Sequence, residues 1–232
     1  MMELTLFSGG AAHGLVEAVT AAFASQTGCS IKGSYGAVGV YRDKYLAGDH
    51  ADMLILSRVL IDGLVQSGDV AAGDVFDIGP VHTSVAVRSG DPRPDISDAA
   101  KLKAALAAAT DIYAPDLKLS SAGIHFATVL EACGVDIDND PRLRRHPNGA
   151  SAMKAMAAQT GGIPIGSTQI TEILPINGVD AIGKLPGQFE LATTYTIGIP
   201  GRCVHRSQAL ALAGLLTCFG NAELRQQAGF GH

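Results

Sequence analysis

Apolar residues along the chain alternate between two spacings. Residues 4–7 alternate like a strand and end at Ser8-Gly9-Gly10, after which apolar residues recur at helical spacing from Leu15 to Phe23. The same order of strand, turn and helix repeats in residues 29–47 and 51–67. Repeated β-α units predict an α/β fold whose sheets are rich in parallel strands and flanked by helices.

Two long apolar strands, expected at residues 77–87 and 192–199, bracket the middle of the chain. Their length indicates segments that cross between two lobes. We therefore predict a first lobe that begins with residues 1–82, a second lobe formed by residues 83–195, and a return to the first lobe in residues 196–232. The polar stretch 136–147 is expected at the surface.

Three turns combine small residues with the start of a helix. They are Ser8-Gly9-Gly10, then Tyr35-Gly36-Ala37-Val38, and then Ser121-Ala122. The N–H groups at a helix start lack helical partners, and together with the helix dipole they attract anions. Ser167-Thr168 offers hydroxyl groups at another strand end. An ordinary strand-to-helix turn would use the same residue types, so both interpretations stay open. The glycine spacing matches neither the dinucleotide fingerprint nor a P-loop.

Charged side chains near these turns extend the hypothesis. Arg42 and Arg58 are candidate carboxylate clamps because a guanidinium group can bind a carboxylate through two parallel hydrogen bonds. The alternative for both is a solvated ion pair with a nearby acid. His82, near the first crossing strand, is a candidate for either the core or the ligand site. The remaining arginines considered are expected at the surface: Arg88, Arg93, Arg142, Arg144 and Arg145.

His13 and His125 follow the first and third turns and are the candidate acid–base residues, because imidazole titrates near neutrality. The alternative is that both are ordinary surface residues of helices. Glu172 is the carboxylate nearest to a predicted site loop. The sequence shows no Ser-His-Asp order and no spacing of metal ligands, so we expect no metal and no cofactor. If there is chemistry, an allylic proton transfer needs the fewest groups.

Composition excludes several partners. The 232 residues carry a formal net charge of −5, with no Trp and 5% aromatic residues, which argues against a nucleic acid or an anionic membrane surface. No apolar run reaches the roughly 18 residues of a membrane-spanning helix, so membrane insertion is not expected. The four cysteines are far apart and contain no C-x-x-C. We expect buried thiols, with a disulfide left open.

Several short motifs occur in a familiar order. They are Leu4-Thr5-Leu6-Phe7-Ser8-Gly9-Gly10, Leu46-Ala47-Gly48, Ala51-Asp52-Met53-Leu54-Ile55-Leu56-Ser57, and Ala114-Pro115 with Ala122-Gly123-Ile124. In this order they resemble a type II periplasmic binding protein, most of all the molybdate-binding branch, which also contains an aconitate isomerase. The resemblance implies two α/β lobes and an oxyanion or carboxylate ligand in the cleft between them.

The departures from that branch concern its ligand groups. Where molybdate proteins have serines in the first two turns, this chain has Ala11 and Ala37-Val38-Gly39, and Gly166 or Ser167 stands in place of a late tyrosine. These changes disfavour tetrahedral molybdate. The extra histidine, tyrosine and arginine side chains favour a larger carboxylated ligand.

Two functions follow as hypotheses. The first is a solute-binding protein for a small anion that delivers its ligand to an ABC permease, periplasmic if a signal peptide has been removed. The second is a cofactor-free isomerase of a small unsaturated di- or tricarboxylic acid. Met1-Met2-Glu3 runs directly into the first strand without a visible leader, which would fit a cytoplasmic protein.

Overall fold

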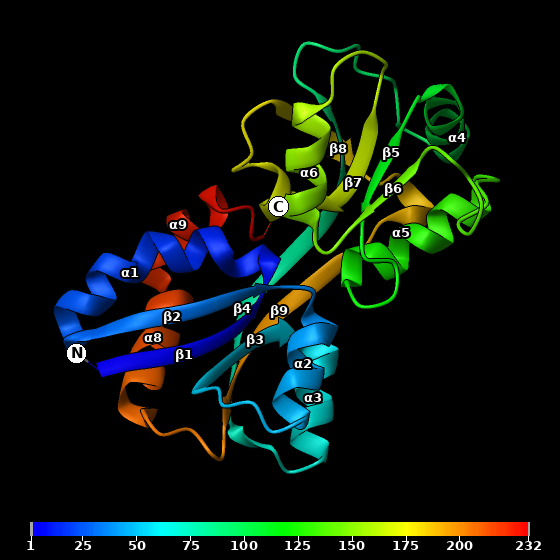
Figure 1. The fold of residues 1–232 in the computed structure, drawn as a ribbon. Coiled ribbons are helices and arrows are strands. Elements are labelled where there is room, and N and C mark those ends of the chain that lie inside the picture. The colour runs from blue at the N-terminus through cyan, green and yellow to red at the C-terminus, as the bar shows by residue number, and fades with distance from the viewer. Residues whose placement is uncertain (1, 232) are drawn as a thin grey trace. The chain divides into compact units, whose positions relative to one another are not determined.

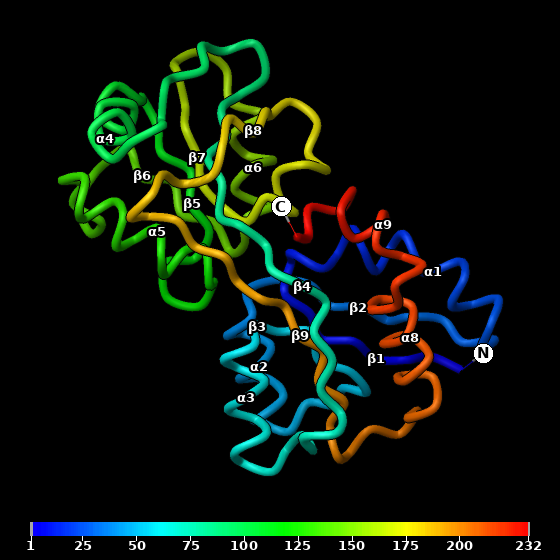
Figure 2. The backbone as a smooth tube through the Cα atoms, turned by 180° about the vertical axis from the view of Figure 1, so that it is seen from behind, coloured from blue at the N-terminus to red at the C-terminus, as the bar shows by residue number. Residues whose placement is uncertain are grey.

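The computed structural model describes residues 2–231 and divides the chain into two units. Unit 1 contains the described residues up to Val81 and those from Thr193 onward, and unit 2 is His82–Ala192. One division falls inside β4 (Val70–Arg88) and the other at the beginning of β9 (Ala192–Pro200). These are the two strands along which the chain passes from one unit to the other (Figure 2).

Unit 1 is built on a sheet with β1 in parallel pairing to both β2 and β3, while β9 runs antiparallel to β3. The elements are β1 (Met2–Gly9), the 3₁₀ turn η1 (Gly10–Ala12), α1 (His13–Thr27), β2 (Cys29–Gly36), α2 (Val38–Leu46), β3 (Met53–Ser57), α3 (Arg58–Gln66), the first part of β4, β9, α8 (Arg206–Thr217), the 3₁₀ turn η3 (Phe219–Asn221) and α9 (Ala222–Gln227). Helices α2 and α3 contact β3, whereas α1 contacts β2 and packs on α8 (Figure 1).

Local sequence explains where these elements begin and end. All five residues of β3 are buried, as expected for a central strand with a continuous apolar run. Helix α1 ends at Gly28, whose φ of 64° is left-handed and whose N–H donates to the carbonyl of Ala24 at 2.9 Å. Glycine adopts that conformation without the steric penalty of a Cβ atom, so it closes the helix here.

Unit 2 has its own mixed sheet, in which β5 is parallel to β6 and β7, and β4 is antiparallel to β7 and β8. Its elements are α4 (Ala99–Ala108), β5 (Ile112–Pro115), α5 (Ser121–Ala132), β6 (Leu143–His146), α6 (Gly149–Ala158), β7 (Ile165–Gln169), α7 (Ile170–Ile173), β8 (Val179–Lys184) and the 3₁₀ turn η2 (Gly187–Phe189).

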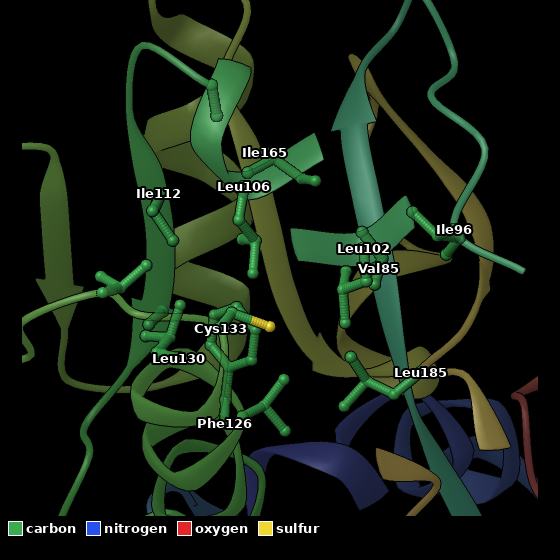
Figure 3. Packing of buried hydrophobic residues seen from close by; sticks show 14 residues of the cluster. Val85, Ile96, Leu102, Leu106, Ile112, Phe126, Leu130, Cys133, Ile165 and Leu185 are labelled. Carbon is green, nitrogen blue, oxygen red and sulfur yellow. The ribbon is translucent and has the colours of Figure 1, made fainter. Parts of the chain in front are cut away.

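Period-2 alternation sends successive side chains of this sheet to two cores. Val85 and Ile112 point into a core that α4 and α5 complete, shown in Figure 3, whereas their neighbours Ala86 and Tyr113 face a second core completed by α6 and α7. Leu102 of α4 lies fully buried in the first core. Burying a side chain of this size stabilises the fold by roughly 1.5–3 kcal/mol.

The structure refines the expected elements at two places. β4 begins at Val70 rather than at residue 77. The sequence pattern did not reveal this first part of the strand, because Ala71, Ala72 and Gly73 are exposed and show no apolar alternation. β6 lies inside the stretch for which the sequence indicated only a polar surface. Its four residues are Leu-Arg-Arg-His, and it forms the edge of the sheet, paired only with β5 among the described strands. An edge strand with one apolar side chain carries no periodic hydrophobic signal.

None of the helices among residues 2–231 combines the length and apolarity that a membrane crossing requires. The four cysteines are free thiols, two buried (Cys29 and Cys133), one partly buried (Cys203) and one exposed (Cys218).

Candidate functional site

The carboxyl ends of β1, β2 and β3 meet at one edge of the sheet in unit 1. Ser8 at the end of β1 pairs in register with Tyr35 of β2 and with Ile55 of β3. Ligands of open α/β sheets bind outside the carboxyl ends of the strands. The parallel pairing therefore gathers the first two predicted turns, together with the start of α3, at the edge where a ligand is expected.

Three helical segments start at this edge without help from a capping side chain. The N-cap residues are Gly9 for η1, Ala37 for α2 and Ser57 for α3, and none of them makes a side-chain hydrogen bond to its helix. First-turn N–H groups have no partner within a helix, so an uncapped start leaves donors for water or for an anion.

Glycine at position 9 is required by close packing. A Cβ atom there would come within 2.7 Å of Val38 Cγ1 and 2.8 Å of Tyr195 Cε1. The end of β1 therefore lies directly against the start of α2. Ser8 itself is fully buried, and its hydroxyl donates to the carbonyl of Gly9 at 2.9 Å, so its hydrogen is already used inside the protein.

Tyr35 and His13 form the polar side-chain group of this edge. Their ring centroids are 4.1 Å apart, and His13 Nε2 lies 3.3 Å from Glu17 Oε1. Burial, with a smaller contribution from the Glu17 charge, raises the pKa of Tyr35 to about 12. The phenol therefore keeps its proton at neutral pH and remains a hydrogen-bond donor.

The two predicted arginine clamps are both paired with carboxylates of unit 1. Arg42 Nη2 lies 2.6 Å from Asp43 Oδ1. Arg58, the first residue of α3, lies 2.8 Å from Asp62 and 2.9 Å from Asp77. Either guanidinium would have to exchange or share these partners to hold a ligand carboxylate.

In unit 2 the third predicted turn starts α5 at Ser121, and Ala122 follows it. The N-cap Ser120 makes no side-chain hydrogen bond to the helix. Gly123 packs so tightly against the carbonyl of Asp116 that a Cβ atom would overlap it. His125 lies one turn later in α5. Its Nε2 lies 2.7 Å from the carbonyl oxygen of Phe189, so this nitrogen carries the proton and donates a hydrogen bond to the backbone.

Other predicted site residues of unit 2 have internal partners. Ser167 and Thr168 are fully buried. Ser167 Oγ donates to the carbonyl of Ser84 at 3.1 Å, and Thr168 Oγ1 donates to Glu172 Oε2 at 2.7 Å. His82 Nδ1 lies 3.2 Å from Glu190 Oε1.

Glu172 occupies the start of α6. The backbone N–H groups of Gly149 and Ala150 hydrogen-bond to its carboxylate, and the next donor, Ser151 N–H, is accepted by Asn148 Oδ1 at 2.8 Å. Burial raises the pKa of Glu172 above its ordinary value, although the hydrogen bonds from Thr168 and the backbone act in the opposite direction. Because these donors are used, α6 offers no comparable opening for an external anion. The sequence signalled Glu172 only by its position near a loop.

Whole-chain comparison decides the family. The family described as bacterial extracellular solute-binding protein matches residues 4–230. This chain belongs to that family.

Relatives of this solute-binding protein differ in what their names record. An aconitate isomerase from Pseudomonas sp is 26% identical over 231 residues, covering 97% of this chain and 86% of the relative. The periplasmic molybdate-binding protein of Azotobacter vinelandii superposes with a TM-score of 0.76 at 16% identity, covering 99% of both chains. The sulfate-binding protein SubI of Mycobacterium tuberculosis gives 0.75 at 18% identity, covering 99% of this chain and 86% of that one.

These matches confirm the α/β fold and the resemblance to type II periplasmic binding proteins of the molybdate branch. The two solved structures establish the fold alone. The interlobe cleft and the roles of individual site residues stay predictions. Among residues 2–231, no group of three or more His, Cys, Asp or Glu side chains is arranged to hold a metal ion.

Proposed function

We propose that this solute-binding protein binds a small carboxylated anion at the carboxyl edge of β1, β2 and β3. The observation that carries the proposal is the set of uncapped helix starts at Gly10, Val38 and Arg58, which direct N–H donors to one edge of the sheet. Elsewhere in unit 1, the N–H groups of Val204 and His205, just before α8, are already bound to the carboxylate of Asp52. The uncapped start of α5, at Ser121 and Ala122, offers donors of the same kind in unit 2.

The side chains at the edge favour a carboxylate over a tetrahedral oxyanion. Ala37, Val38 and Gly39 supply no hydroxyl group, and the Ser8 hydroxyl donates internally. Tyr35 and His13 are larger and flatter, and they suit a planar carboxylate attached to a carbon skeleton. Among the relatives, the aconitate isomerase is named for a carboxylic acid, which supports the same ligand class.

Ligand screening by isothermal titration calorimetry tests this proposal. We expect binding of cis-aconitate, trans-aconitate or a related di- or tricarboxylate, and weaker binding of molybdate and sulfate. Tyr35→Phe removes one phenolic donor and should weaken binding about tenfold, the value of one hydrogen bond to a charged group. Tyr113→Phe, which removes a phenol of unit 2 that donates to Gln159, is the matched control and should bind normally. Selective binding of molybdate or sulfate, or equal losses in the two variants, would contradict the proposal.

Isomerisation is the second candidate function, and the grouping of His13, Tyr35 and Glu17 favours it. His13 would take a proton from the carbon next to the double bond, and the resulting carbanion would be delocalised over the allylic system. Return of that proton to the far allylic carbon, from the imidazolium of His13 or by way of His125, moves the double bond without a net change in atoms or electrons. We assign the first step to His13 because His125 donates to Phe189.

Proton NMR of cis- and trans-aconitate incubated with the protein in D₂O tests the second function. Turnover would appear as interconversion, with or without deuterium uptake. We expect His13→Gln to lower the rate by about 10²–10⁴, the usual contribution of a general acid or base, and His125→Gln to lower it less. Unchanged substrate after long incubation removes aconitate isomerisation and leaves the binding proposal intact.

A further inference from the structure

Tyr195 of β9 lies where the uncapped helix starts of unit 1 meet. In the antiparallel pairing of β3 and β9 it is the partner of Ser57, the N-cap residue of α3. Its ring reaches past the end of β3 to Gly9, the N-cap residue of η1, where a Cβ atom would come within 2.8 Å of Tyr195 Cε1. The same Cβ atom would come within 2.7 Å of Val38 Cγ1, in the first residue of α2. The three helix starts therefore converge around Gly9 and the Tyr195 ring.

Packing is what fixes the direction of N–H groups at these starts, because an uncapped start has no capping side chain to do so. Tyr195 is only 4% exposed, and its ring fills the space that a side chain at position 9 would otherwise take. Protein interiors are packed so closely that a turn resting on a flat ring cannot settle inward. The ring therefore determines where the backbone of Gly9 lies as it enters η1.

Phe230 supports the Tyr195 ring. The two rings meet edge to face, with centroids 6.3 Å apart and planes at 80°, which is a favourable arrangement for an aromatic pair. Phe230 is itself buried, and the next residue, Gly231, donates its N–H to the carbonyl of Pro80 at 2.8 Å. Tyr195 thus packs on a second ring that the backbone anchors to β4.

Thr196, the next residue of β9, is linked to the start of α3. Successive side chains of a strand point to opposite faces, so Thr196 faces away from Tyr195. Its hydroxyl donates to Asp77 Oδ1 at 2.6 Å, and Asp77 Oδ2 accepts a hydrogen bond from Arg58 Nη1 at 2.9 Å. Arg58 is the first residue of α3. Two consecutive residues of β9 are therefore connected, directly or through one carboxylate, to the segments that begin η1 and α3.

We propose that Tyr195 is a positioning residue of the anion edge, and that its aromatic ring rather than its hydroxyl group has this role. The ring sets the position of Gly9, and with it the turn into η1 and the start of α2 that packs on Gly9. This inference rests on the proposed function of the edge. Because β9 is one of the two strands along which the chain passes between the units, the position of the N–H donors depends on that strand (Figure 2).

Tyr195→Leu, Tyr195→Phe and Tyr45→Leu form a matched set of variants. Tyr45 is a tyrosine of unit 1 that is as deeply buried, but it lies near the end of α2, beneath the guanidinium group of Arg202. In isothermal titration calorimetry with cis-aconitate we expect Tyr195→Leu to weaken binding about 10- to 100-fold, the value of hydrogen bonds to a charged group that are no longer aligned. Tyr195→Phe keeps the ring, and it should bind as the wild type does, as should Tyr45→Leu.

A second measurement needs no ligand. Order parameters from ¹⁵N relaxation report on the backbone N–H groups of residues 9–12 and 38–40. We expect them to fall in Tyr195→Leu from about 0.85, typical of a rigid backbone, toward about 0.6, and to stay unchanged in Tyr195→Phe and Tyr45→Leu. Circular dichroism checks that each variant folds. Should Tyr195→Leu not fold, Phe230→Leu takes its place and should lower the same order parameters less, with the exposed Phe219→Leu as its control.

Three outcomes would overturn the positioning role. They are unchanged order parameters in Tyr195→Leu, equal falls in Tyr45→Leu, or a loss of affinity in Tyr195→Phe as large as that in Tyr195→Leu. Failure of the wild type to bind cis-aconitate or a related di- or tricarboxylate would instead contradict the proposed function, and the order parameters would still decide the role of Tyr195. The two proposals therefore fail separately.

Discussion

Each unit buries one carboxylate that accepts backbone N–H groups at or just before the start of a helix, but the pKa values of the two acids shift in opposite directions. In unit 1, Asp52 accepts the N–H groups of Val204 at 2.9 Å and His205 at 3.1 Å, just before α8, and that of Thr5 at 2.9 Å. In unit 2, Glu172 accepts the N–H groups of Gly149 and Ala150 at α6. Both side chains are almost completely shielded from solvent, with exposures of 0% and 6%.

Their surroundings shift the two pKa values in opposite directions. Burial acts to raise the pKa of Asp52, but three backbone donors and the neighbouring His50 outweigh it and hold the pKa below 3.8. His50 is about half exposed and lies 3.4 Å from Asp52, so this acid sits just beneath the surface. For Glu172 burial dominates and raises the pKa. Each acid accepts hydrogen bonds from three N–H or O–H donors, so the comparison teaches that depth and a neighbouring histidine, rather than donor number or exposure alone, decide whether a buried carboxylate stays ionised.

The two shifts give opposite pH dependence of stability. The folded pKa of Asp52 lies below the unfolded one, so its contribution is complete above about pH 4 and is lost as pH falls through the folded value. The folded pKa of Glu172 lies above the unfolded one, so its contribution is complete below about pH 4.5 and is lost as pH rises through the folded value.

Removal of the Asp52 charge should have the largest effect. Asp52→Asn leaves one amide oxygen and a misplaced NH₂ group facing three backbone donors, and we expect a loss of about 3 kcal/mol of unfolding free energy at pH 7. Urea denaturation measures it. Asp49→Asn, an exposed neighbour, should change stability by less than about 0.5 kcal/mol. If the loss of unfolding free energy in Asp52→Asn does not shrink below pH 4, the negative charge of Asp52 is not what stabilises the segment before α8.

The close approach at the start of α6 gives the next effect. A Cβ atom on Gly149 would overlap both Thr168 Oγ1 and Glu172 Oε2, so Gly149→Ala must displace a buried carboxylate. We expect a destabilisation of about 2 kcal/mol, within the range for overpacked sites. Gly63→Ala in α3 meets open space and should instead stabilise the protein by about 0.5–1 kcal/mol. Equal thermal melting temperatures for wild type and Gly149→Ala would disprove the packing described here.

Thr168→Val keeps the shape of the side chain and removes its donation to Glu172, made at 2.7 Å. We expect a loss of about 1 kcal/mol, greater at pH 8 than at pH 5, because an ionised carboxylate needs the donor more than a protonated one. Chemical denaturation at the two pH values provides the measurement. A loss that is the same at both would mean that Glu172 keeps one charge state across this range.

Glu172→Gln should have the smallest net effect, and its sign should depend on pH. The variant lacks the titrating group, so relative to wild type it should gain stability as pH rises from 4 to 8. Asp52→Asn should instead lose stability relative to wild type as pH rises from 2 to 5, because only the wild type gains the stabilising carboxylate charge in that range. Parallel stability curves for wild type and Glu172→Gln would contradict the raised pKa.

The same contrast between occupied and open helix starts limits where a ligand can bind. Side chains accept first-turn N–H groups at α4, where Asp98 does so, and at α6, where Asn148 and Glu172 do so. Asp52 accepts the two N–H groups that come just before α8. The chain leaves η1, α2, α3 and α5 without a capping side chain. These four starts follow β1, β2, β3 and β5, at the carboxyl ends of parallel strands, whereas the starts of α7, α8 and α9, which also lack a capping side chain, do not share one such edge.

Local sequence was sufficient for the parts of the fold with a periodic pattern. The strand of residues 4–7, the buried run ending at Ser57 and the glycine turn at Ser8-Gly9-Gly10 are properties of neighbouring residues, and the structure contains each of them. β6 lacked such a pattern because an edge strand of mostly charged residues is held by backbone pairing to β5. For the site, sequence located the turns but not the partners that occupy Ser167, Thr168 and Arg58.

The strands and helices with a periodic pattern and the glycine-rich turn after β1 were determined by the sequence alone, because spacing and turn chemistry act over a few residues. Tertiary structure decided which donors remain open. Asp52 accepts the N–H group of Val204 from 152 positions away, and His125 donates to the carbonyl of Phe189 from 64 positions away. Such contacts depend on chain segments brought together by packing, and no local pattern encodes the distance between them.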